Sequence, residues 1–258
     1  MWIVLAAAAW LLMLSPGAGA ADLSAEARRA NLDATDRQVR TVSLPAGKTV
    51  SIDVTVGDVR IDGWDRPDAE ITVERHAPAA SQFIRLPIAI ADSAETVAVR
   101  ALQTENTTEA ALRADVAVRL PRSAAIDRVQ VMEGRITIER FSGRITADIR
   151  RGPIDGKDLS GTVRLEAGIG SITVTAARLS PNGLLRMRTF NGDVRLSLAE
   201  RPADARVMAL ALNGHIKSDI PLRTRDTWGP RWSEATLGKG EPVISLDVVT
   251  GTVEIKCP

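Results

Sequence analysis

Apolar and polar residues alternate with a period of two along much of this chain, in short segments that glycine restarts. Glycines at positions 134, 143, 152, 161 and 170 are separated by nine residues each, and related units surround Gly57, Gly183, Gly192, Gly214 and Gly251. In all ten units the second residue after glycine is apolar and the third is polar, and the fourth is apolar in eight of them. Because side chains on a strand point alternately to opposite faces, the pattern predicts short strands with one face in a core and the other in water.

The glycine spacing also predicts how the strands are connected. Glycine tolerates the positive φ angle of a tight corner, and three corners are Asn-Gly, at 182–183, 191–192 and 213–214. The tripeptide Phe141-Ser142-Gly143 recurs as Leu159-Ser160-Gly161, eighteen residues later. This interval favours an elongated β-solenoid with two nine-residue faces per turn. The alternative is a β-sandwich of hairpins, which shows the same alternation but gives no reason for an interval of eighteen.

Four regions follow from these patterns. Residues Trp2 to Leu14 are continuously apolar and Ala18-Gly19-Ala20 matches a signal-peptidase site, so residues 1–20 read as a signal peptide. No Lys or Arg precedes the apolar run, and an uncleaved membrane anchor is the alternative. The other predicted regions are a flexible leader at 21–38, an N-terminal β region at 39–128, and a Gly-x-apolar β-repeat region with a C-terminal cap at 129–258.

Composition narrows the class of protein. Apolar residues make up 45% of the chain, enough for a sizeable core, while aromatics are only 3%. The net charge of +1 matches poorly with a nucleic-acid binder, which needs a basic excess or patch. Cys257 is the single cysteine, so the chain forms no internal disulfide. That thiol is either idle or pairs with another molecule.

A family resemblance rests on particular segments. The run Val56-Gly57-Asp58-Val59-Arg60-Ile61-Asp62-Gly63-Trp64-Asp65 resembles the opening of the bacterial putative-adhesin family, a β-strand-repeat family of unknown function. The Gly-x-apolar repeats are similar too, as is the end, from Asn213-Gly214 through Gly238-Lys239-Gly240 to Thr250-Gly251 and Ile255. The resemblance covers roughly residues 40 to 256. It implies an elongated β-repeat fold in the cell envelope and offers no catalytic residues to transfer.

Catalytic chemistry has little support in the sequence. The two histidines, His76 and His215, have no second His, Cys or His-x-Glu pattern near them. Acidic residues of the repeats alternate with Arg and Thr, which is typical of a solvated sheet face: Asp58, Asp148, Asp155 and Asp193. We therefore predict no catalytic, cofactor-binding or metal-binding residues.

Two features are candidates for binding. One is an outward ladder that could meet an acidic polymer if its basic members align, or else be an ordinary soluble face: Arg60, Thr137, Thr146, Arg164, Thr173, Arg186, Arg195 and Lys217. The other is a set of tryptophans that could contact sugars or proteins, or else cap the fold. The resulting candidate binding surface is Arg164, Arg186, Arg195, Lys217, Trp64, Trp228 and Trp232.

The sequence as a whole predicts an exported, non-enzymatic, adhesin-like binding or scaffold protein of the periplasm or cell surface, without a cofactor. The expected partner is a cell-wall or acidic polysaccharide or an envelope protein, with no nucleic acid and no membrane span once the signal is cleaved. The alternatives are a β-helical carbohydrate-active enzyme and a self-assembling structural envelope protein.

Overall fold

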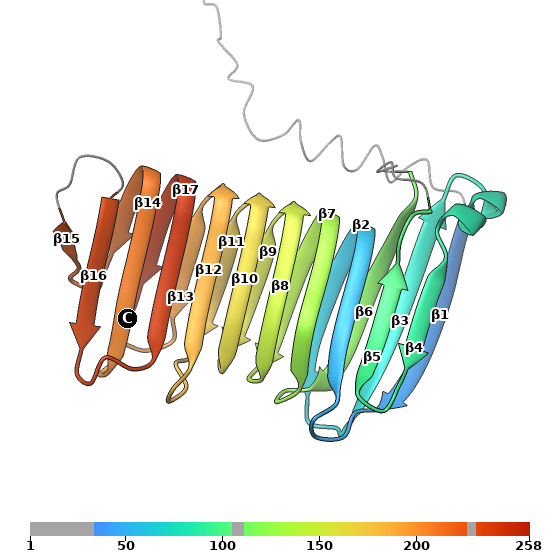
Figure 1. Ribbon diagram of the computed structural model, residues 1–258, viewed down its shortest axis with the longest axis horizontal. Coiled ribbons are helices and arrows are strands. Elements are labelled where there is room, and N and C mark those ends of the chain that lie inside the picture. The colour runs from blue at the N-terminus through green and yellow to red at the C-terminus, as the bar shows by residue number, and fades with distance from the viewer. Residues whose placement is uncertain (1–33, 105–110, 226–230) are drawn as a thin grey trace, which may run out of the picture.

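The protein is built almost wholly of β-strands in two facing layers, as the computed structural model shows (Figure 1). The structure describes residues 34–104, 111–225 and 231–258. The predicted signal peptide at 1–20 and Trp228 lie outside the described residues. One short 3-10 helix, η1 (Ala80–Arg85), follows the third strand. No helix in the described part of the chain is long and apolar enough to cross a membrane.

The first layer contains the strands that begin each winding of the chain. In spatial order they are β4 (Ile88–Asp92), β5 (Thr96–Ala101), the first half of β2 (Thr49–Trp64), the first half of β7 (Ala125–Phe141), β8 (Arg144–Arg151), β10 (Thr162–Ile169), β12 (Leu184–Asn191), the first half of β17 (Val243–Lys256), the first half of β14 (Ala205–Ser218), β16 (Arg231–Leu237) and β15 (Arg223–Arg225). All neighbours from β5 to β14 are parallel.

The second layer contains the strands that complete each winding. In spatial order they are β1 (Ala34–Ser43), β3 (Asp68–Ala77), β6 (Arg113–Pro121), the second halves of β2 and β7, β9 (Ile154–Leu159), β11 (Ile172–Ala177), β13 (Val194–Leu198) and the second halves of β17 and β14. The C-terminal strand β17 lies between β12–β13 and β14, so it fills a place that the chain passed over earlier.

Eight parallel strands close into a ring, because the long strands β7 and β17 pair with both layers. The ring runs β7–β8–β10–β12–β17–β13–β11–β9 and returns to β7. The predicted all-β class is confirmed. The closed ring of eight parallel strands, with further strands outside it, is not plainly a solenoid or a sandwich of hairpins. The predicted interval of eighteen is confirmed locally, since Phe141 lies beside Leu159 and Arg144 beside Thr162. It lengthens at the next winding, where Thr162 lies beside Leu184.

A column of stacked glycines forms one of the two corners between the layers. Gly170 has φ +149°, and a Cβ there would lie 2.0 Å from the carbonyl oxygen of Gly152. The corner is thus closed to any side chain by close backbone approach as well as by its φ angle. The other members of this glycine column are Gly57, Gly134, Gly152, Gly192, Gly251 and Gly214.

One hydrophobic core fills the space between the layers. The predicted inward position is buried in nine of the ten glycine units, and Ile216 is the half-buried exception. Ile216 lies on the second half of β14, the last strand of the second layer, and therefore lacks a covering neighbour on one side. The described strands alternate between buried and outward positions, which leaves two outward faces, one on each layer.

Candidate binding surface

The predicted ladder is divided between the two outward faces. On the first layer, Thr146, Arg164 and Arg186 lie side by side on β8, β10 and β12. On the second layer, Thr137, Asp155, Thr173, Arg195, Glu254 and Lys217 form a separate row that begins at Arg60. The structure therefore brings Arg164 and Arg186 together, and separates both from Arg195 and Lys217.

Carboxylates neutralise most of the basic row on the second layer. Arg60 pairs with Glu139 at 3.3 Å, and Arg195 pairs with Asp193 at 2.5 Å and with Glu254 at 3.9 Å. Lys217 lies beside Glu254 in the β14–β17 register. This face thus has the alternating charge of a solvated sheet, and it offers an acidic polymer little net attraction.

Arginine side chains on β10 and β12 of the first layer are less tightly paired with carboxylates. Arg186 lies 4.0 Å from Asp247, at the limit of an ion pair. For Arg164 and Arg188, no carboxylate among the described residues lies within that limit. Exposed arginines without close carboxylates keep their donors for a partner.

Two carboxyl groups on this layer titrate abnormally. Burial raises the pKa of Asp247, and nearby Glu166 adds to the rise while Arg186 and Arg188 oppose it. Burial also raises the pKa of Asp148, and Glu166, its neighbour across β8 and β10, adds like-charge repulsion. Charges of both signs therefore lie in one crowded row across β8, β10, β12 and β17.

An exposed apolar row runs beside these charges, and the sequence analysis did not identify it. Ile169, Phe190 and Leu212 are 55%, 63% and 44% exposed, and half-buried Val249 lies between β12 and β14. Each precedes a glycine of the column by one or two residues. The alternation of the strand could have revealed Phe190, because it follows Arg186 and Arg188 at intervals of two residues and therefore lies on their outward face. We call the outward side of β10, β12, β17 and β14 on the first layer the β12–β17 face.

The tryptophans do not form a shared site in the described structure. Trp64 is half-buried at the end of β2, where its Nε1 donates to the carbonyl oxygen of Asp68 at 2.9 Å and Arg66 lies 4.3 Å from its ring centroid. Trp232 lies on β16 beside Leu210, next to the β12–β17 face. Trp64 thus stabilises its own turn, while Trp232 extends the apolar surface.

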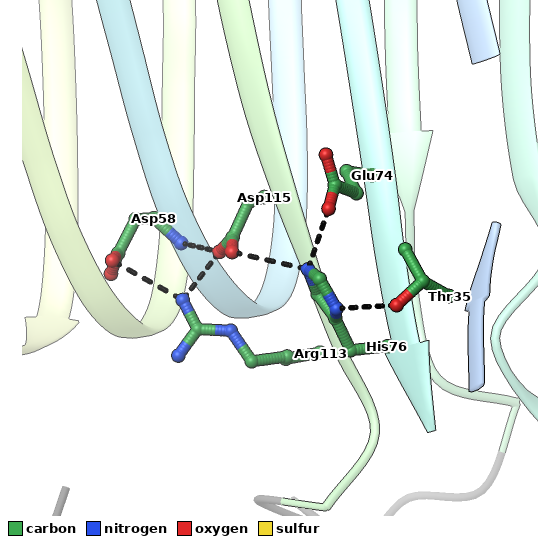
Figure 2. A network of polar contacts seen from close by, with 6 residues as sticks. All are labelled: Thr35, Asp58, Glu74, His76, Arg113 and Asp115. Atoms are coloured by element: carbon green, nitrogen blue, oxygen red, sulfur yellow. Dashed lines mark hydrogen bonds and ion pairs between the residues drawn. The ribbon is translucent and has the colours of Figure 1, made fainter. Parts of the chain in front are cut away.

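A polar network joins β1, β2, β3 and β6 at the opposite end of the molecule (Figure 2). Arg113 bonds to Asp115 and lies 3.2 Å from Asp58, while His76 Nε2 lies 3.6 Å from both Glu74 and Asp115. Burial acts against the charge of Arg113, but the hydrogen bonds and attraction of Asp115 and Asp58 raise its pKa. Asp115 also accepts the backbone N–H of Asp58 at 2.8 Å. These contacts tie strands together, which is a structural role for His76.

The remaining candidates for chemistry are dispersed. His215 lies on the outer strand β14 beside Thr252, and Cys257 is half-buried against the core. Within the described residues, no three His, Cys, Asp or Glu side chains are grouped to hold a metal ion. An open cleft of about 620 Å³ lies among the connections that follow β11, β13 and β16, and Arg201, Glu200 and Lys239 line it.

The fold defines a structural class: an all-β repeat protein with two facing layers and a ring of parallel strands. A protein from Clostridium sporogenes described as a putative cell adhesion protein shares the fold, with a TM-score of 0.50 and 12% identity over 87% of this chain and 100% of that one. A putative adhesin from Bacteroides fragilis is also similar, with a TM-score of 0.35 and 10% identity over 85% of this chain and 97% of that one.

The predicted resemblance to the bacterial putative-adhesin family agrees with this likeness of fold, since the Clostridium sporogenes protein is described as a putative cell adhesion protein. No protein-family model matches the sequence, and no curated protein matches it. At 12% identity the likeness establishes the fold. The function must be argued from this chain's own surface.

Proposed function

We propose that the protein is an exported, non-enzymatic, adhesin-like binding protein of the cell envelope, and that its partner docks on the β12–β17 face. The observation that carries the proposal is the apolar row of exposed Phe190, half-buried Val249 and exposed Leu212, which lies next to Arg188 and close to exposed Ile169. Exposed apolar residues in a contiguous row next to charges are typical of interaction surfaces. On the opposite face, carboxylates neutralise Arg60 and Arg195 locally.

Export to the periplasm or the cell surface fits both the signal-like start of the sequence and the names of the structural neighbours. A cell-wall or acidic polysaccharide, or an envelope protein, remains the expected partner. The candidate residues Arg164, Arg186 and Trp232 belong to or adjoin the proposed face. Arg195, Lys217 and Trp64 lie away from it.

Binding to envelope material tests the proposal. Residues 21–258 should co-sediment saturably with isolated cell envelopes, and the variant Phe190→Ser with Arg164→Ala should lose about tenfold in affinity. A matched pair of changes on the other face, Thr175→Ser with Arg60→Ala, should leave binding unchanged. Purified cell-wall and acidic polysaccharides, at low and high salt, would separate a charged polymer from a protein partner. Equal loss in both variants would refute the assignment of the face.

Enzymatic activity is no part of the proposal. The outward carboxylates of the repeat strands are spread over both faces, while Glu200, Asp204 and Glu241 line the open cleft with Arg201 and Lys239. Incubating the protein with the same polysaccharides should release no new reducing ends. Turnover of any of them would replace the binding proposal with the carbohydrate-active alternative.

A further inference from the structure

The outward residues of β12 and β17 match row by row. Leu184 lies beside Val243, Arg186 beside Ser245 and Arg188 beside Asp247. The next outward positions are Phe190 and Val249, between the registered pairs Thr189–Val248 and Asn191–Thr250. Two neighbouring parallel strands therefore present apolar, polar, oppositely charged and again apolar rows in the same order.

From this match we propose that the β12–β17 face is the interface of a two-fold symmetric dimer of this chain. A two-fold axis parallel to the strands, midway between β12 and β17, places β12 of one copy opposite β17 of the other. Each residue then faces its row neighbour from the second copy. The proposal rests on the proposed function and names the partner of that face.

The rows become complementary under this symmetry. Arg188 faces the second copy's Asp247, and Phe190 faces its Val249, so on β12 and β17 opposite charges meet in one row and apolar groups meet in the next. Arg186 faces Ser245, a polar group. The adjacent strands β10 and β14 also exchange places, so Leu212 faces Gly168 of the second copy, one residue before its exposed Ile169. Phe190, the most exposed apolar residue of the row, thereby gains an apolar contact.

Charge favours a second copy over an acidic polymer on this face. Glu166 lies beside Arg188 on β10, and Asp247 lies beside it on β17. These carboxylates would repel a polymer of one negative sign, whereas a surface with both signs in matched rows complements itself. A parallel layer with apolar residues on its outward side is also usually covered.

The area of the β12–β17 face sets the expected affinity of the dimer. Its strands span roughly 20 Å by 20 Å, or about 400 Å² of sheet per copy, from ordinary strand spacing. This lies at the small end for protein interfaces, where association is weak and reversible. We therefore expect a dimer that forms at micromolar concentrations and dissociates on dilution.

Sedimentation equilibrium of residues 21–258 over a wide concentration range tests the inference. The wild type should show a monomer–dimer equilibrium. Phe190→Glu should weaken it about tenfold or more, because a charge is then buried opposite Val249. Thr175→Glu, on the outward side of the second layer, should have no effect.

A charge exchange makes the symmetry itself testable. Arg188→Asp alone places two carboxylates opposite each other and should weaken the dimer, as should Asp247→Arg alone. The double variant should regain it. Lys157→Asp, an outward charge reversal on β9, is the matched control, and circular dichroism of each variant would exclude loss of fold.

A wild type that stays monomeric throughout would overturn the dimer. If such a monomer still binds cell envelopes through Phe190, the proposed function stands with a different partner. If it neither dimerises nor binds, both proposals fail. A dimer that is insensitive to Phe190→Glu and to the charge exchange would place the interface elsewhere.

Discussion

Gly170 shows how a single residue type controls the corner of this fold. Its φ of +149° is strained for any residue with a side chain, and a Cβ would lie 2.0 Å from the carbonyl oxygen of Gly152. Gly47 also has a positive φ, +92°, but nothing lies within 4 Å of a Cβ built there. A side chain at Gly47 would add backbone strain alone, whereas one at Gly170 would add both backbone strain and steric overlap.

We expect Gly170→Ala to lower the free energy of unfolding by about 3 kcal/mol, because the added methyl forces the stacked backbones apart. Gly47→Ala should cost only about 1 kcal/mol, since it adds conformational strain alone. Chemical denaturation of the two variants measures the difference. Equal losses would show that the column tolerates a methyl group.

Asp148 provides a residue-scale prediction with a pH dependence. Its pKa lies above 3.8 through burial and the nearby Glu166, so the folded state binds the proton more tightly than the unfolded chain. The wild type therefore gains stability as the pH falls through this pKa, and loses that gain as the pH rises.

Asp148→Asn should raise stability near neutral pH by about 0.5 kcal/mol, a small value because solvent screens this partly exposed group. The advantage should shrink towards zero below pH 3.8, where the carboxyl is protonated in both states. Thermal unfolding of both proteins across this range tests the sign. An advantage that grows in acid would contradict the assigned cause.

At the scale of elements, the Arg113 network joins the antiparallel strands to the parallel ones. Arg113 is only 15% exposed and contacts Asp58 on β2 and Asp115 on β6. His76 extends these contacts to β3, and Thr35 on β1 lies 3.4 Å from its Nδ1 (Figure 2). The network thus links four strands at one end of the molecule.

Arg113→Gln should destabilise the fold by about 2 kcal/mol, because it leaves two neighbouring carboxylates without their cation. Amides of β1 and β3 should then exchange with solvent faster than those of β10 and β11, as hydrogen exchange would reveal. The control is Arg100→Gln, whose side chain is 62% exposed and lies 3.9 Å from Asp53. It should change little.

Sequence patterns predicted the strands well where the nine-residue unit repeats. They were less informative where strands that are distant in sequence lie side by side. The nine-residue glycine spacing located the corners because each glycine is required by backbone contact with the winding before it. The predicted basic ladder did not form one row, because successive nine-residue units lie on opposite layers. Arg164 and Arg195 share a unit position, yet they lie on different faces. Phe190 was missed because its exposure depends on neighbours from β10 and β17, which lie far away in sequence.

At the scale of the whole molecule, β17 holds the C-terminal part of the fold together. It pairs with β12 and β13 on one side and with β14 on the other. Without it, β14 and β16 have no described strand of the ring to pair with, and the ring is open.

A chain that ends at Pro242 should therefore lose ordered structure in β14 and β16 and expose the edges of β12 and β13. We expect rapid proteolysis within residues 199–242 and concentration-dependent aggregation. A chain that lacks only Cys257 and Pro258 should behave like the intact protein. Protection of 199–242 in the shorter chain would show that this part pairs independently.

The place of β17 also has a consequence for the timing of folding. A chain that leaves the ribosome or an export channel from its N-terminal end presents β14 and β16 before the strand that must separate them from β12. Until β17 arrives, the ring has a gap one strand wide. An incomplete chain therefore exposes the unpaired edges of β12, β13 and β14. The ring closes only after the polypeptide has emerged through Lys256.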